Sequence, residues 1–449
     1  MLTDGTTYIT TTGLIFGLSM GLLLLVLPKR YALMPILALV FFMTMGERVL
    51  IGGLNFTMIR ILLLCGWVRL VIRGEIRRLK FNPIDIAIVL WVISGLILHN
   101  ILWQTGAEFQ NSLGGAYDKV GTYFLLRFLV RDVQDITRVI KLLAIFIVPL
   151  AVVMLNEKLT GRNMFFAFGG VPEFTVVRES SLRCQGPFGH PILAGSFGAA
   201  LMPFFIALYR DTKWLAVLAV VSAAAVVVTS ASSGPLGACA FGILALCMWP
   251  LRRSMRKIRW GIGLTVLTLQ LVMTSSVWFL MARVDIVAGS TGYHRALLID
   301  QAVHHINEWW LVGKKGTADW GGHLEDVTNQ YIAEGVNGGL LTMALFILVI
   351  VRCYGGVGFA VRTLEGSPQV SAHFAFYIWS LGAALLVHTM TFLSVSYFDQ
   401  NAISWYLLLA MISSAYSAAL LLRRSKAAEA RPVLQFDGAE LSEWSTSKI

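Results

Sequence analysis

The side chains best suited to chemistry gather in one polar stretch, residues 292–340, which lies between long apolar segments. The stretch contains Arg295, His323, Glu325 and Asp326. A guanidinium group offers phosphate oxygens a planar fork of N–H donors. A histidine or a desolvated carboxylate can act as the general base for a sugar hydroxyl. Such a cluster in an apolar chain indicates a functional site in a water-filled cavity or at a membrane surface.

A second candidate group lies at residues 181–191, which read SLRCQGPFGHP and lead into an apolar segment. Their glycines and prolines predict a tight turn that holds Arg183 and His190 near the membrane edge. Arg183 is either an anion ligand or an interfacial cation that reaches lipid headgroups. We favour the anion ligand, because this arginine lies in a turn rather than at a basic helix end. We predict that Arg183 and Arg295, although more than 100 positions apart, meet in one outward-facing pocket.

The segment that closes the polar stretch predicts a helix that enters the next apolar span near Val336. Asn329 and Tyr331 lie at the start of this helix. Asp326, just before it, is either a general base or the helix N-cap, because short acidic side chains serve both purposes. The sequence leaves these two roles of Asp326 open.

Other kinds of chemistry are not indicated. Residues 293–311 have the apolar spacing of an amphipathic helix, but His304 and His305 are adjacent and point in different directions, so no metal site is predicted. Asp85 stands alone near a span end, so no proton relay is predicted. The small residues at 229–234 (TSASSG) are interpreted as a close helix-packing site rather than a nucleophile.

The composition is that of a membrane protein: 57% of residues are hydrophobic, 14% are charged and the mean hydropathy is +0.72. Soluble domains contain a larger charged fraction. Apolar runs of about 17–25 residues predict an all-α polytopic protein with about 12–13 transmembrane helices in one domain, residues 1–425. The predicted spans are 12–28, 31–46, 56–73, 84–102, 118–130, 140–155, 191–209, 214–231, 234–250, 260–282, 336–352, 373–391 and 401–422.

Basic residues follow every second predicted span, which places the N-terminus outside and the C-terminus in the cytoplasm. The net charge of +11 is spread over these short connections, so no nucleic-acid partner is predicted. Two outer connections are long, 156–190 and 283–335, and we expect them to be ordered. Their cations break the positive-inside pattern, which indicates either an anionic substrate or anionic headgroups. The polar tail, 426–449, is predicted to be disordered.

Three patterns together resemble those of the bacterial O-antigen ligase and polysaccharide polymerase superfamily. They are a span-opening segment with Arg183, Gly186, Phe188 and Pro191, then Arg295, then a run with Asn329, Tyr331, Ile332, Gly335, Gly338, Gly339 and Leu340. The resemblance covers about residues 120–420. The ligases typically have histidine directly before the asparagine of the last run, where this chain has Thr328. This departure favours the polymerases over the ligases.

The resemblance implies a GT-C-like membrane glycosyltransferase of the bacterial inner membrane, working at the periplasmic face without metal or cofactor. Its donor would be an undecaprenyl-diphosphate-linked glycan, and its acceptor another lipid-linked repeat for a polymerase or lipid A-core for a ligase. Arg183, Arg295 and His190 would bind the diphosphate, and His323 or Asp326 would supply the base. A chain-length regulator or export machinery would be further partners. The alternative from another class is a transporter of lipid-linked glycan or polysaccharide, which should place charges mid-span around a central cavity.

Overall fold

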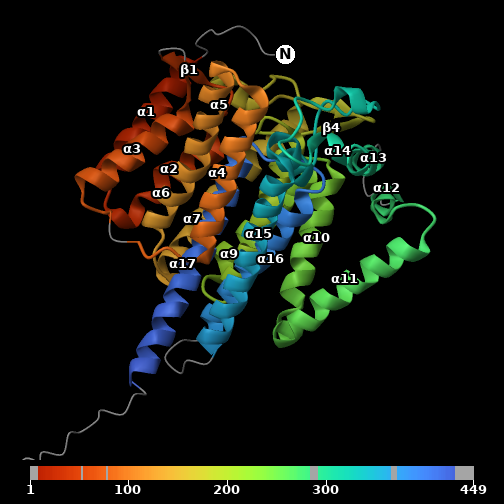
Figure 1. The fold of residues 1–449 in the computed structure, drawn as a ribbon. Helices are drawn as coiled ribbons and strands as arrows, with labels where there is room; N and C mark the ends of the chain where they lie inside the picture. Colours follow the sequence, from red (N-terminus) through yellow and green to blue (C-terminus); the bar gives the residue numbers. More distant parts are fainter. Residues whose placement is uncertain (1–8, 52–53, 77–78, 284–291, 366–371, 430–449) are drawn as a thin grey trace, which may run out of the picture.

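The computed structural model describes residues 9–51, 54–76, 79–283, 292–365 and 372–429, which are almost entirely helical (Figure 1). The helices of the first half are α1 (Thr11–Val26), α2 (Leu33–Phe42), α3 (Met58–Ile72), α4 (Pro83–Trp103), α5 (Gly106–Ala116), α6 (Thr122–Leu129), α7 (Val133–Thr160) and α8 (Pro191–Leu208). Those of the second half are α9 (Lys213–Thr229), α10 (Ser233–Cys247), α11 (Met255–Val272), α12 (Leu280–Arg283), α13 (Gly292–His304), α14 (Ile306–Trp309), α15 (Gln330–Glu365), α16 (Ala372–Thr391) and α17 (Asp399–Glu429).

Short elements connect these helices. The 3₁₀ segments are η1 (Lys29–Tyr31), η3 (Met164–Phe168), η4 (Trp249–Ser254), η5 (Val277–Phe279) and η6 (Ala318–Trp320), and one π-helical turn is η2 (Tyr117–Gly121). Two antiparallel hairpins pair β1 (Arg48–Ile51) with β2 (Leu54–Thr57), and β3 (Val176–Arg178) with β4 (Ser181–Arg183). The second hairpin carries the predicted arginine of the first long connection.

A helix forms at each predicted span, but their lengths differ from the expectation. By length and composition, six of the described helices can cross a membrane, or seven if α10 and the bent segment after it form one span. Helix α2 has 10 residues and α6 has 8. At about 1.5 Å per residue, ten residues reach only half of a hydrocarbon core about 30 Å thick. The structure is that of an all-α multi-pass membrane protein, and the predicted 12–13 spans are too many by this measure.

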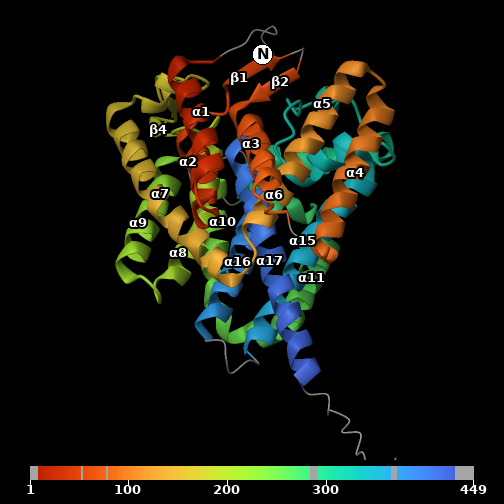
Figure 2. The same cartoon turned by 90° about the vertical axis from the view of Figure 1, so that its left-hand side faces the viewer.

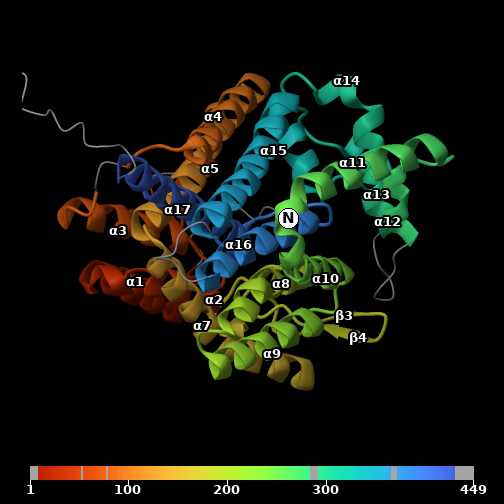
Figure 3. The same ribbon diagram turned by 90° about the horizontal axis from the view of Figure 1, so that it is seen from below.

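The centre of the bundle is formed by α8, α15, α16 and α17. Helix α15 packs against α4, α16 and α17, and α8 packs against α9, α10 and α16. Viewed from below, α16 lies between α15 and α8 (Figure 3). The side view shows α1, α2 and α3 together on one flank, where α1 contacts both of the others (Figure 2).

Helix α11 stands apart from this bundle. The chain turns by 81° between α10 and the segment that contains α11 (Figure 1). Every residue from Arg259 to Val272 is exposed, although most of them are apolar. The predicted span 260–282 therefore ends early, at Val272, and is continued by η5 and α12.

The polar stretch folds around a small core of its own. Buried members include Leu298, Trp309, Trp320 and Leu324, which pack against the start of α15. Because this cluster holds α13, α14 and η6 together, the stretch is an ordered cap on the bundle. The predicted amphipathic helix over 293–311 is two helices, α13 and α14, with a break at His305.

Glycines in α15 let the cap dock onto the bundle. Gly338 and Gly339 have non-helical backbone angles inside α15. The kink leaves the Val336 carbonyl to accept from the Lys314 N–H at 2.8 Å, and the Leu340 N–H to donate to the Trp310 carbonyl at 2.8 Å. A Cβ on Gly339 would lie 2.5 Å from the Leu311 carbonyl oxygen, and its φ is +70°, so only glycine fits. The glycines of this sequence pattern therefore allow the backbone of the cap to pack directly against α15.

The C-terminal helix is longer than expected. Helix α17 continues to Glu429, so residues 426–429 are helical rather than part of a disordered tail. Residues 430–449 lie outside the described residues.

Candidate functional site

A buried carboxylate fixes the turn that carries Arg183. Glu157, near the end of α7, accepts from the N–H of Gln185 at 3.1 Å and from the N–H of Gly186 at 2.9 Å. The Thr175 hydroxyl donates to the same carboxylate at 3.2 Å. Glu157 is fully buried, so these bonds replace its hydration. The carboxylate thus accepts hydrogen bonds from the turn, and it forms no ion pair with an arginine among the described residues.

Arg183 points from this turn toward the beginning of α10. Its Nη2 donates to the Ser232 hydroxyl at 2.9 Å, and its Nε is buried without a partner among the described residues. Ser232 is the N-cap of α10, yet its side chain accepts none of that helix's backbone N–H groups. The helix N-terminus, which carries a partial positive charge, therefore faces an arginine.

Arg295 approaches the same place from α13. A Cβ placed on Gly234 would lie 3.8 Å from Nη1 of Arg295 and 2.8 Å from Oγ of Ser394. The Nε of Arg295 is also buried without a partner in the described part of the chain. The structure thus brings Arg183 and Arg295 together at the first turn of α10, because the hairpin and the cap both fold over it.

A third arginine, Arg178 on β3, completes what we call the arginine cluster (Arg178, Arg183 and Arg295). Burial, together with the charges of Arg178 and Arg183, lowers the pKa of Arg295 to about 10. Burial and Arg178 also lower the pKa of Arg183. None of the three forms an ion pair with a described carboxylate. Three neighbouring cations without a counter-ion among the described residues have the chemistry that suits an anion.

His190 and Asp326 lie beside the arginine cluster. The Nδ1 of His190 accepts from the Ile192 N–H at 3.2 Å and so caps α8, which leaves the proton of the neutral ring on Nε2. Desolvation by the surrounding protein lowers the pKa of His190, Arg183 lowers it further, and Asp326 opposes the shift. Asp326 is exposed and lies at the edge of the neighbouring cavity.

The remaining predicted residues are not part of the cluster. His323 is exposed, has a φ of +56° and makes no hydrogen bond or ion pair with the described residues. Asn329 is the N-cap of α15, since its side chain accepts from the N–H groups of Tyr331 and Ile332, so the N-cap prediction for Asp326 is wrong. The Tyr331 hydroxyl donates to the Thr389 carbonyl at 3.0 Å, which ties α15 to α16. Both motif residues therefore have structural roles.

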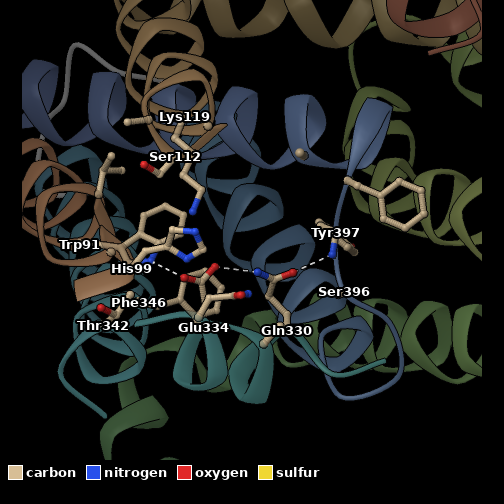
Figure 4. Close-up of a pocket in the computed structure, with 18 of the residues that line it drawn as sticks. Trp91, His99, Ser112, Lys119, Gln330, Glu334, Thr342, Phe346, Ser396 and Tyr397 are labelled. Atoms are coloured by element: carbon tan, nitrogen blue, oxygen red, sulfur yellow. Dashed lines mark hydrogen bonds between the residues drawn. The ribbon is translucent and has the colours of Figure 1, made fainter. Parts of the chain in front are cut away.

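A cavity of about 610 Å³ lies next to the cluster, between α4, α5, η2, α15, α17 and the segment before α17. Figure 4 shows Glu334 at its centre, where it accepts from the Trp91 Nε1–H at 2.9 Å and from the Gln330 Nε2–H at 2.7 Å. The Gln330 Oε1 accepts from the Tyr397 N–H at 2.6 Å. Lys119 extends into the cavity above the Trp91 ring (Figure 4). The volume is within the range of small-molecule sites, about 300–1,000 Å³.

Sequence reasoning missed two parts of this site. Arg178 is five positions before Arg183, but only the hairpin aligns both, with Val176 opposite Arg183 in the register. The small residues at 229–234 do allow close packing, since a Cβ on Gly195 would lie 2.3 Å from the Ser230 Oγ. The same run of small residues ends at the N-terminus of α10, which Arg183 and Arg295 both approach. A small-residue run directly before a predicted span was the available signal.

Fold and site together define an all-α multi-pass membrane protein with a polar cavity and an arginine cluster that has no carboxylate partner among the described residues. No protein-family model matches the chain, and no curated protein matches it at a significant level.

Proposed function

We propose that this protein is a membrane glycosyltransferase, GT-C-like in architecture, that polymerises undecaprenyl-diphosphate-linked oligosaccharide repeats at the periplasmic face of the bacterial inner membrane. The observation that carries the proposal is the arginine cluster, whose half-buried guanidinium groups lack any carboxylate partner in the described chain. A diphosphate has the charge and the acceptor oxygens that these donors lack. Lipid headgroups alone do not explain the buried Nε atoms.

The cluster would act on the leaving group. The bond between the anomeric carbon and the diphosphate oxygen breaks, the lipid diphosphate departs with the electron pair, and the acceptor oxygen forms the new glycosidic bond. Negative charge grows on the diphosphate in the transition state, where fixed guanidinium groups stabilise it. The His190 Nε2–H and the N-terminus of α10 are further donors on the same side.

The acceptor hydroxyl must lose its proton to a base. Of the two predicted candidates, Asp326 is the better placed, because it lines the cavity and acts on the pKa of His190. His323 lines no part of this cavity among the described residues. We therefore assign the proton to the Asp326 carboxylate. Thr328, whose buried hydroxyl has no partner in the described chain, replaces the histidine typical of ligases, which is why we propose a polymerase first.

Glycan assembly in a deletion strain tests this proposal. The strain would be complemented with wild type, Arg183→Ala or Arg295→Ala, and the length and carrier lipid of the glycan would be measured. Single repeats left on undecaprenyl diphosphate would support the polymerase. Long glycan retained on that carrier would instead identify a ligase.

Two further outcomes contradict the proposal. Unchanged glycan in both arginine variants, at normal protein levels, would remove the enzymatic role of the cluster. Repeats that accumulate on the cytoplasmic side of the membrane would identify a transporter of lipid-linked glycan, which uses the same charge chemistry without bond formation.

A further inference from the structure

The cavity beside the arginine cluster differs from the cluster in chemistry. None of its described lining residues is an arginine, and its polar lining consists of amides, hydroxyls, three carboxylates, a histidine and Lys119. The walls also contain aromatic rings, among them Trp91 and Tyr397. Amide, carboxylate and aromatic groups in one cavity suit a ligand that both donates and accepts hydrogen bonds and has apolar ring faces. A sugar is such a ligand.

The polar groups of the cavity are held in place before any ligand binds. Glu334 is almost completely buried, and its two oxygens accept from Trp91 and Gln330. Gln330 is fixed in turn by the backbone N–H of Tyr397. A carboxylate has about four lone-pair sites, so Glu334 retains acceptor capacity for a ligand hydroxyl. Preorganised groups of this kind lose little entropy on binding.

Lys119 provides a donor opposite this network. Its ammonium lies 4.8 Å from the centre of the Trp91 ring and makes no hydrogen bond or ion pair with the described residues. Figure 4 shows it directed into the cavity together with His99 and Glu334. Lys119 lies on the π-helical turn η2, and such turns are frequent at functional sites. The turn therefore presents to a ligand a cation that has no carboxylate partner among the described residues.

Asp326 links the cavity to the arginine cluster electrostatically. It lines the cavity, and its charge opposes the lowering of the His190 pKa that burial and Arg183 cause. A ligand hydroxyl held beside Asp326 would have this carboxylate as its base. The cavity is therefore the candidate place for an acceptor.

We propose that this cavity is the acceptor site and that it binds the sugar that supplies the attacking hydroxyl, with Lys119 and Glu334 as its recognition groups. This inference rests on the proposed glycosyltransferase function. It assigns donor and acceptor to separate groups of residues: the diphosphate to the arginine cluster, and the acceptor sugar to the cavity.

Lys119→Met is the sharpest test, because it keeps the side-chain stem and removes the unpaired charge. Lys315→Met is the matched control: the Lys315 ammonium also lies over a tryptophan of α4, 5.5 Å from the Trp103 ring centre, but Lys315 lines no part of the cavity. The proteins would be reconstituted in liposomes with a synthetic undecaprenyl-diphosphate-linked repeat as donor. The acceptor would be a soluble glycoside of the same repeat, which lacks diphosphate.

We expect Lys119→Met to raise the KM for the acceptor about 10-fold to 100-fold, as for loss of one charged hydrogen bond, and to leave the KM for the donor unchanged. Glu334→Gln should act in the same direction, and Lys315→Met should change neither constant. Transfer with an acceptor KM that is unchanged by both cavity variants would overturn the acceptor site and leave the glycosyltransferase standing. A wild-type protein that transfers nothing would overturn the proposed function, and the acceptor site with it.

Direct binding provides a second readout that does not depend on turnover. Saturation-transfer NMR with the same glycoside, without donor, should show binding to wild type and to Lys315→Met, and a weakened signal with Lys119→Met. Equal signals for all three proteins would overturn the assignment. Melting temperatures within about 2 °C of wild type would show that the variants are folded.

Discussion

Arg127 and the arginines of the cluster have opposite surroundings. Arg127 on α6 is 3% exposed and lies 3.6 Å from Oδ1 of Asp85. Its guanidinium nitrogens donate to three hydroxyls of α17, those of Ser413, Ser414 and Ser417. Arg183 and Arg295, in contrast, each have a buried Nε without a partner in the described chain. One arginine joins helices, and the other two lack an anion.

Structural and functional buried charges can be distinguished by whether the fold itself compensates them. A buried charge is tolerated when an opposite charge and hydrogen bonds compensate it. Arg127 meets that condition within the fold, so it needs no ligand. The arginine cluster does not meet it, and like charges at close range add to the cost. The cluster therefore lowers the stability of the folded protein, and binding of an anion would offset this loss.

The largest expected effect is on the compensated arginine. Arg127→Met leaves Asp85 buried without its cation, and we expect the free energy of unfolding to fall by about 3–5 kcal/mol. Denaturation of the purified protein in detergent measures this. The double variant Arg127→Met/Asp85→Asn removes both charges and should recover much of the loss. A single variant as stable as wild type would contradict the structural role.

Arg295→Gln, in contrast to Arg127→Met, should reduce activity rather than stability. We expect transfer to fall about 10²–10³-fold, as when one transition-state donor is removed, while stability stays equal or rises because a like charge is lost. Inorganic pyrophosphate should raise the melting temperature of wild type but not of this variant. Unchanged thermal stabilisation by pyrophosphate in Arg295→Gln would show that the cluster does not hold the anion.

A smaller effect is expected at the residue that positions the cluster. Glu157→Gln keeps the shape but turns one acceptor oxygen into a donor, so one N–H of the Arg183 turn loses its partner at a cost of about 1–3 kcal/mol. The KM for the donor should rise more than the KM for the acceptor. Glu173→Gln is the control, since Glu173 lies at the surface, 3.9 Å from Arg162. Equal effects of the two substitutions on the donor KM would contradict the positioning role.

The smallest effect concerns pH. The pKa of His190 is lowered in the ligand-free protein by desolvation and by Arg183 and Arg178, with Asp326 opposing, so its ring is neutral at pH 7. A bound anion favours the protonated ring and raises this pKa, so binding takes up a proton. Affinity for pyrophosphate should therefore increase as the pH falls below about 6.5.

His190→Gln should remove this increase, which titration calorimetry at several pH values can measure. The variant also controls for the ionisation of pyrophosphate itself, because that contribution remains. An identical pH dependence in wild type and His190→Gln would show that His190 takes no part in anion binding.

Some features of the helices and of the site could be predicted from the sequence, and others could not. Apolar runs located most of the helices but not their lengths, since α2 has 10 residues and α6 has 8, and α5 forms outside the predicted spans. The prediction that Asp85 stands alone is wrong, because its partner Arg127 is 42 positions away on another helix. Arg183 and Arg295 were singled out by residue type and position in outer loops.

Hydropathy and residue type suffice to predict an all-α membrane protein with arginines in two long polar connections. These properties are local, since hydropathy and side-chain chemistry belong to each segment alone. The pairing of Arg127, the meeting of Arg183 and Arg295 at α10 and the cavity that Lys119 and Glu334 share follow from the tertiary structure. Those contacts link segments far apart in the chain, and they depend on how the helices pack against each other.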